Sequence, residues 1–248
     1  MWAHDVRKNT PWTRPEILTR TVLICGMVPC PWAWLPRVRG TACVGATLGG
    51  MQGSEDRYDR ETALVVVDVQ NDFADPEGSL YVREGEAVVP IANGQIGDAW
   101  STGAFVVYTQ DWHPETTLHF EKDGGLWPVH CVHDTWGAMF HPDLRVIGDV
   151  VQKGTQGEDG YSAFSVRDPR SGDTAPTVLH GLLAERGVRR IVICGLATDF
   201  CVVETVTDAR DLGYPVFVVR DGIRAVDRKA GAGDRAIRRM FDAGATLV

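Results

Sequence analysis

Three sequence features are missing or weak in this chain of 248 residues, and each absence excludes a class of function or of structure. Basic residues are not in excess, since the formal net charge is −8, which argues against nucleic acid as a partner. No Gly-x-Gly-x-x-Gly follows a strand-like run, which argues against a dinucleotide cofactor. The six cysteines lack the paired spacing of a disulfide framework, so we expect free thiols and a cytoplasmic protein.

The first fifty residues differ in composition from the rest of the chain. They hold six Arg or Lys against two Asp or Glu, and four of the eight Trp. Their apolar run, 21–35, contains prolines and is too short to cross a bilayer, so no membrane partner is expected. Residues 41–43 make a poor secretory cleavage site. We predict an N-terminal extension over 1–58, either disordered or an over-called start with Met51 as initiator, and one domain over 59–248.

Strand-like apolar runs alternate with helix-like stretches from residue 62 onward. We expect strands at 63–69, 104–110, 149–152, 190–194, 216–219 and 246–248, and helices at 85–101, 176–186, 199–212 and 235–243. This alternation predicts an α/β fold with a mainly parallel, doubly wound sheet and helices on both faces. Residues 111–145 form a long polar loop, and loops of that length are usually functional or disordered.

Reactive side chains recur where these strands end. Asp68 ends the first strand, Lys153 ends the third, and Cys201 follows the fourth, in the first turn of a helix with Thr198 as its expected N-cap. The carboxyl ends of parallel strands form the edge at which such sheets bind ligands. A helix start also favours a thiolate and offers N–H groups to an oxyanion. The alternative is a packed cysteine and a solvated lysine.

A second set of side chains has the chemistry of metal ligands. Asp111 and His113 stand two residues apart where a strand ends, so both side chains point to the same side. His119 and His130 follow in the same loop. One carboxylate with two or three imidazoles suits one divalent transition metal ion, either zinc, ferrous iron or manganese. Scattered surface histidines are the alternative.

Five motifs in order resemble those of one enzyme family. They are Asp-Val-Gln-Asn-Asp-Phe at 68–73, Asp-x-His at 111–113, Trp-Pro-x-His-Cys at 127–131, Lys-Gly at 153–154 and Gly-Leu-Ala-Thr-Asp-Phe-Cys-Val at 195–202. They are similar to the nicotinamidase/pyrazinamidase branch of the isochorismatase-like cysteine hydrolases. The resemblance covers about residue 62 to the C-terminus, and the first sixty residues have no counterpart in it.

The resemblance implies an activity and a catalytic set. The activity is hydrolysis of a carboxamide C–N bond, converting nicotinamide to nicotinate and ammonia through a thioester in pyridine nucleotide salvage. It implies a triad of Asp68, Lys153 and Cys201. It also implies a cis peptide between Leu196 and Ala197, and an oxyanion hole made by the backbone N–H groups of Ala197 and Cys201.

The resemblance also implies ligands and pocket walls. The metal ligands are Asp111, His113 and His130, with His119 at a position that ligates in only some relatives; the aromatic walls around a pyridine ring are Phe73, Trp127 and Tyr161. Phe200 stands where some relatives have a histidine. A homo-oligomer is left open.

Three other functions compete with this interpretation. An amidohydrolase acting on an N-carbamoyl or ureido compound shares the triad but generally lacks the metal set, so bound metal distinguishes the two. An isochorismatase proper usually lacks the cysteine. A non-catalytic redox or metal sensor would use Cys201 and the histidines, and release of ammonia from nicotinamide would eliminate it.

Overall fold

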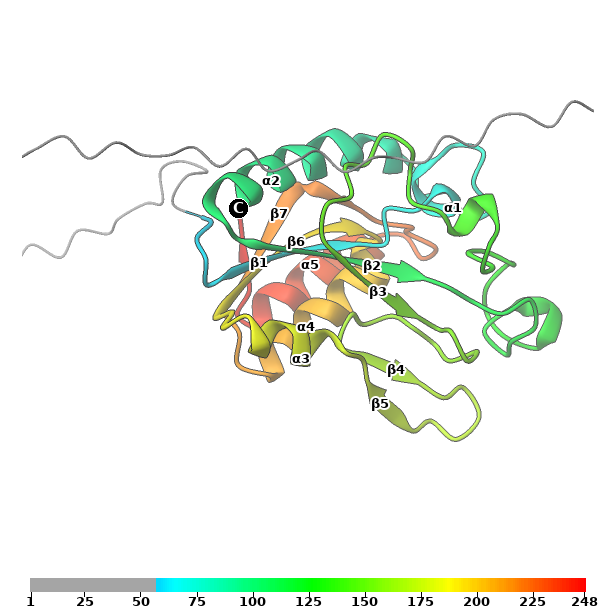
Figure 1. Cartoon of the computed structure of the whole chain (residues 1–248). Coiled ribbons are helices and arrows are strands. Elements are labelled where there is room, and N and C mark those ends of the chain that lie inside the picture. The colour runs from blue at the N-terminus through cyan, green and yellow to red at the C-terminus, as the bar shows by residue number, and fades with distance from the viewer. Residues whose placement is uncertain (1–56) are drawn as a thin grey trace, which may run out of the picture. The chain divides into compact units, whose positions relative to one another are not determined.

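The computed structural model describes residues 57–248 (Figure 1). Apart from its last two residues, the predicted extension 1–58 lies outside this part of the chain, as do Met51 and the three cysteines of the leader. The other three cysteines, Cys131, Cys194 and Cys201, are buried free thiols. Among the described residues, no helix combines the length and the apolar character needed to span a membrane.

A six-stranded parallel sheet forms the centre of the described domain, as predicted. Its strands are β1 (Thr62–Val67), β2 (Phe105–Asp111), β3 (Asp149–Lys153), β6 (Arg190–Leu196), β7 (Val216–Arg224) and β8 (Thr246–Leu247). They lie in the order β3-β2-β1-β6-β7-β8, and every neighbouring pair is parallel. The chain therefore builds outward from β1 to one edge, then returns to place β6 on the other side of β1.

Helices cover both faces of this sheet, which confirms the predicted doubly wound architecture. Figure 1 shows α2 (Val88–Thr102) on one face, and α3 (Leu179–Glu185), α4 (Val203–Asp211) and α5 (Ala232–Asp242) on the other. In β1, Leu64 and Val66 belong to the core under α2, whereas Ala63 and Val65 belong to the opposite core. Because both faces are buried, β1 is a continuous apolar run without polar alternation.

Several local predictions were wrong. An antiparallel pair, β4 (Ser165–Arg167) and β5 (Thr174–Pro176), was not predicted. It displaces the start of the predicted helix 176–186 to Leu179, because Pro176 is occupied in β5. The predicted helix 85–101 begins with a short 3₁₀ turn at Gly85–Ala87. A short helix, α1 (Asn71–Ala74), follows β1.

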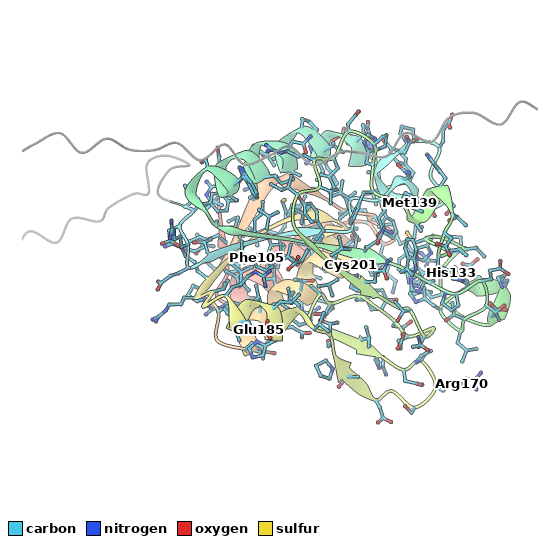
Figure 2. All side chains as sticks on the ribbon, in the orientation of Figure 1. Phe105, His133, Met139, Arg170, Glu185 and Cys201 are labelled. Carbon is cyan, nitrogen blue, oxygen red and sulfur yellow. The ribbon has the colours of Figure 1, made fainter. Side chains whose placement is uncertain are left out.

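The long loop between β2 and β3 folds back on itself. It contains 3₁₀ turns at Glu121–Asp123 and Trp136–Ala138, with single bridges from His113 to Val132 and from Phe120 to Trp127. Several of its own side chains are buried, including those of Phe120, Trp127 and Ala138, in a molecule whose interior Figure 2 shows filled with side chains. This loop therefore packs as a folded segment at the carboxyl end of the sheet.

Candidate active site

The candidate site lies at the carboxyl end of the sheet, at the place where its strand order reverses. Asp68 follows β1, and Ala197 follows β6, the strand beside it. Asp111 ends β2, and Lys153 ends β3. In open parallel sheets this position, outside the strand ends at the topological switch, is where ligands bind.

Lys153 is the centre of a buried polar cluster. Its Nζ lies 2.8 Å from Asp68 Oδ2, 2.8 Å from Asp111 Oδ1 and 3.7 Å from Cys201 Sγ, and it also donates to the Gly160 carbonyl. Oxygen atoms of the two carboxylates and the Cys201 sulfur all lie within 4.8 Å of one another. The structure thus brings together the three side chains of the predicted triad, with Asp111 as a fourth member.

Asp68 is held by more than Lys153. The Thr109 hydroxyl donates to Asp68 Oδ1 at 2.7 Å, and the Asp68 backbone adopts φ +46, in the left-handed region that non-glycine residues rarely occupy. Such conformations persist where the surrounding structure imposes them, and they are frequent at functional sites. Thr109 was not predicted, although its position two residues before Asp111 on a strand places both side chains on one face.

The protonation states follow from burial and from the shared ammonium group. Burial raises the pKa of Asp68 to about 6, against the opposing effect of Lys153. At Asp111, burial acts to raise the pKa, but Lys153 and the neighbouring His113 and His130 together outweigh it and hold the pKa below its usual range. For Lys153, burial is outweighed by Asp111 and Asp68, and the pKa is raised. Near neutral pH the cluster therefore contains an ammonium group and two carboxylates, of which Asp68 is the more basic.

Cys201 lies in the first helical turn after β6, as predicted, but the details differ. This turn is π-helical (Thr198–Val202) and leads into α4. The residue that caps it is Ala197, so Thr198 is not the N-cap and makes no capping hydrogen bond. The predicted lowering of the thiol pKa is also wrong, because burial raises the pKa of Cys201 despite the nearby Lys153. The thiol is therefore protonated until a base removes its proton.

The backbone before Cys201 has the predicted conformation. The Leu196–Ala197 peptide is cis, and both Ala197 and Cys201 line the same pocket. The Phe200 and Val202 N–H groups donate to the Ala197 carbonyl. The residues expected to supply the oxyanion hole therefore border the pocket beside the thiol.

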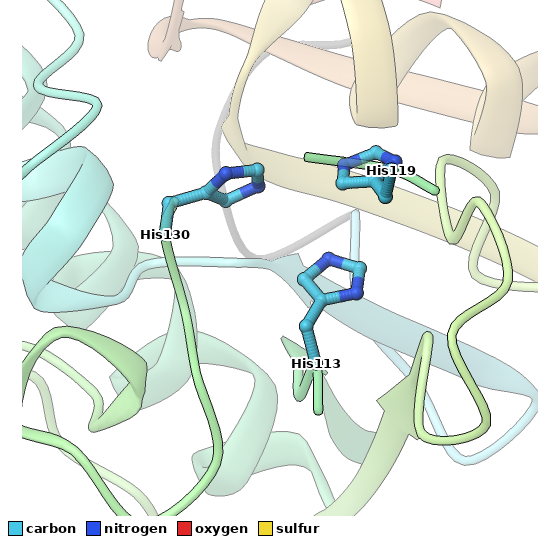
Figure 3. Close-up of side chains that lie close together, drawn as sticks. All are labelled: His113, His119 and His130. Carbon is cyan, nitrogen blue, oxygen red and sulfur yellow. The ribbon is translucent and has the colours of Figure 1, made fainter. Parts of the chain in front are cut away.

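Three histidines from the β2–β3 loop converge beside this cluster. Each of the buried side chains of His113, His119 and His130 offers a ring nitrogen within 4.8 Å of the other two (Figure 3). Burial lowers the pKa of His130 to about 4, so that ring is neutral, as a ligand must be. Asp111 Oδ2 lies 3.8 Å from His113 Nε2, so the fourth predicted ligand borders both clusters.

The imidazoles fit a metal ion better than a set of hydrogen bonds. Neither ring nitrogen of His113 has a hydrogen-bond partner, although both are buried. The Nδ1 atoms of His119 and His130 are engaged, by Asp159 at 2.6 Å and by the Pro128 carbonyl at 2.8 Å. Metal-ligating histidines usually bond one nitrogen to a carboxylate or carbonyl and keep the other for the metal. The residues present therefore suit a divalent transition metal ion.

Aromatic side chains form the pocket walls. The structure places Phe73, Trp127 and Tyr161 around one pocket, and the Trp127 indole N–H donates to the Tyr161 hydroxyl at 2.8 Å. Phe200 meets Trp127 edge to face, with ring centroids 4.7 Å apart. Leu80 and Val226, which were not predicted, complete the apolar lining. Cys201, Asp111, His119 and His130 add further polar groups to this surface. A flat, small, mainly apolar molecule suits these walls.

The comparisons with known proteins agree on one family. The Isochorismatase domain matches residues 62–248. Nicotinamidase from Escherichia coli (strain K12) is 38% identical over 203 residues, covering 75% of this chain and 93% of that protein. The chain therefore belongs to the isochorismatase family, as the motifs predicted. It is a hydrolase of the type that acts on amide bonds.

Two solved structures are similar to this chain in both sequence and fold. The crystal structure of pyrazinamidase of Pyrococcus horikoshii in complex with zinc is 39% identical, with a TM-score of 0.67 over 76% of this chain and 98% of that one. PnC1 from L. infantum in complex with nicotinate is also 39% identical, with a TM-score of 0.68 over 76% of this chain and 92% of that one. The relatives named here are thus a nicotinamidase, a pyrazinamidase and a protein solved with nicotinate.

Proposed function

We propose that this chain hydrolyses nicotinamide to nicotinate and ammonia, with Cys201 as the nucleophile and residues 59–248 as the catalytic domain. The observation that carries the proposal is the convergence of Asp68, Lys153 and Cys201 beneath an aromatic-walled pocket, beside three histidines. The nicotinamidase relatives and a neighbour bound to nicotinate support the choice of substrate. Its product would enter pyridine nucleotide salvage, and the expected location is the cytoplasm.

Acylation of the enzyme begins with a proton transfer. Asp68, whose pKa burial raises to about 6, is a suitable base for the thiol proton. The Cys201 sulfur then attacks the carboxamide carbon, and the N–H groups of Ala197 and Cys201 stabilise the oxyanion of the tetrahedral intermediate. Asp68 returns the proton to the departing nitrogen. The C–N bond breaks, ammonia leaves, and a thioester to Cys201 remains.

Deacylation uses the same base for a second nucleophile. Asp68 accepts a proton from water as the water attacks the thioester carbon, and it returns this proton to the Cys201 sulfur as the second intermediate collapses and the C–S bond breaks. The nicotinic acid that is released loses its own proton to solvent and leaves as nicotinate. Lys153 stays protonated throughout, because it lies between two carboxylates, and it keeps Asp68 oriented toward the sulfur. The aromatic walls Trp127 and Tyr161 hold the ring and exclude water from its faces.

The histidine cluster has a separate part in this proposal. His113, His119 and His130, with Asp111, would hold one divalent transition metal ion, either zinc, iron or manganese. When bound, this ion supplies a Lewis acid that can accept a ring-nitrogen lone pair or polarise water. A neighbour solved in complex with zinc supports this assignment.

The test is release of ammonia from nicotinamide by the purified, metal-loaded chain. Cys201→Ala should lower turnover by at least about 10³-fold, because no other thiol borders the described pocket, while the metal content stays unchanged. Cys194→Ala is the matched control, since Cys194 is also buried but lies in β6 within the core under α2. Retained activity in Cys201→Ala would rule out covalent catalysis. Activity on an N-carbamoyl compound but not on nicotinamide would reassign the substrate.

A further inference from the structure

Asp159 is a carboxylate beside the histidine cluster that the proposed mechanism does not use. Its Oδ1 lies 2.6 Å from His119 Nδ1, and only 18% of its side chain is exposed. Its backbone is fixed as well, because its N–H donates to the Arg167 carbonyl at 2.8 Å and its carbonyl accepts from the Arg167 N–H at 2.9 Å. Arg167 belongs to β4, so the antiparallel pair holds this carboxylate in place.

The contact determines which nitrogen of His119 is available. A carboxylate accepts hydrogen bonds, so the proton of a neutral His119 ring is held on Nδ1, and Nε2 keeps the lone pair that a metal ion needs. The His119 ring is stacked on His113, with centroids 4.6 Å apart, and lies 5.3 Å from the His130 centroid. His119 is therefore fixed in both orientation and tautomer toward the cluster.

The charge of the surroundings gives Asp159 a second role. The imidazoles of the cluster are neutral ligands, and the negative charge of Asp111 is already shared with the Lys153 ammonium at 2.8 Å. With the carboxylates ionised, Asp68, Asp111 and Lys153 together carry a single negative charge. Asp159 adds another, and the resulting total matches the charge of a divalent cation. Without Asp159, a buried cation would be incompletely compensated.

We propose that Asp159 is a positioning residue of the metal site, which presents His119 as a ligand and supplies part of the charge that balances the ion. This inference rests on the proposed metal site. The same loop also connects that site to the catalytic lysine, because the carbonyl of the next residue, Gly160, accepts a hydrogen bond from Lys153. A carboxylate that orients a ligating histidine typically changes metal affinity by 10- to 100-fold.

The experiment measures zinc affinity of the metal-free full-length chain by competition with a chelator. Asp159→Ala should weaken Zn²⁺ binding by roughly 10- to 100-fold. Asp159→Asn should lose less, because its amide oxygen can still accept from Nδ1–H but carries no charge. Glu158→Gln is the matched control, since it makes the same charge change one residue earlier, where the carboxylate accepts from the Gln156 N–H instead. Its affinity should equal that of the wild type.

A second comparison shows whether Asp159 acts through His119. In a His119→Ala background, adding Asp159→Ala should cause a smaller loss than in the wild type, because the ring that the carboxylate orients is gone and only its charge still acts on the ion. Wild-type affinity in Asp159→Ala, or an equal loss from Asp159→Ala with and without His119, would overturn the proposal. Zinc affinity is independent of turnover. A chain that binds zinc through Asp159 but releases no ammonia would refute only the proposed function.

Discussion

Replacing Lys153 by Met tests whether the buried ion cluster determines the stability of the site. The chain offers a natural comparison, because Lys122 Nζ lies 2.9 Å from Asp123 Oδ2, nearly the same separation as in the pair of Lys153 with Asp68. The difference is burial, since the Lys122 side chain is 44% exposed and the Lys153 side chain is fully buried. Lys122→Met removes an ammonium group that contacts one carboxylate, and Lys153→Met removes one that contacts two.

The expected cost at the buried site follows from the two carboxylates that remain. Asp68 and Asp111 have oxygens within 4.8 Å of each other, and at an effective dielectric constant of about 20 two such charges repel by at least about 3.5 kcal/mol. Removing one partner of a buried ion pair typically costs about 3–5 kcal/mol. Lys153→Met should therefore lower the free energy of unfolding by about 3–5 kcal/mol at pH 8. Lys122→Met should change it by less than about 0.5 kcal/mol.

The loss should also depend on pH in a defined direction. Without Lys153, one carboxylate in the folded variant takes up a proton that the unfolded chain does not hold, so lowering the pH stabilises the variant. The folded wild type takes up a proton on Asp68 only near pH 6. Between about pH 8 and pH 6 the difference between the two proteins should therefore shrink by up to about 1.4 kcal/mol per pH unit.

Urea unfolding of the metal-free proteins at several pH values measures both quantities. Removing the metal beforehand ensures that the charge of an ion does not replace that of the lost ammonium group. Equal destabilisation by Lys153→Met and Lys122→Met, or a loss that is the same at pH 6 and pH 8, would refute the reasoning.

Three further substitutions test other parts of the site, the sheet and the helix α2 that covers it. Thr109→Val removes the hydroxyl that donates to ionised Asp68 at 2.7 Å, a hydrogen bond worth about 1.5–3 kcal/mol. The acidic limb of the pH profile of kcat/KM should therefore move up by about 1–2 pH units. An unchanged limb would mean that Asp68 is not the group whose ionisation that limb reports. Gly195→Ala places a Cβ 2.0 Å from the Val67 carbonyl at φ +125, and should cost at least about 3 kcal/mol in urea unfolding. Gly94→Ala, in α2 with nothing within 4 Å, should instead stabilise by about 0.5–1 kcal/mol.

The central sheet could be predicted because the hydrophobic pattern of each strand is visible in a short stretch of sequence. Strands buried on both faces are apolar along nearly their whole length, so β1 (Thr-Ala-Leu-Val-Val-Val) and β6 (Arg-Ile-Val-Ile-Cys-Gly-Leu) are visible as apolar runs without polar alternation. The pair β4–β5 could not be predicted in the same way. Every residue of β5 is exposed, and no burial pattern distinguishes it from a loop.

The site shows the same division between local and long-range information. Asp68, Lys153 and Cys201 were predicted because each follows a recognisable strand and belongs to a motif, and their roles remain predictions. Thr109 could have been predicted from strand periodicity, because it lies on the same face of the strand as Asp111. The role of Asp159 could not be predicted from the sequence. Its contact with His119 joins residues 40 positions apart through a loop whose course no local pattern specifies.

One pairing in the sheet affects how such an enzyme can diversify. Asp111 and Lys153 are register partners on β2 and β3, so their separation is set by the distance between hydrogen-bonded strands, about 4.8 Å. The backbone ladder thus sets the spacing of these opposing charges, and the loop after β3 adds the Gly160 carbonyl that accepts from Lys153. Insertions and exchanges in the overlying segments can reshape what the pocket admits without disturbing that charge arrangement. Selectivity can therefore change in the overlying segments while the charge pair that the sheet spaces is retained.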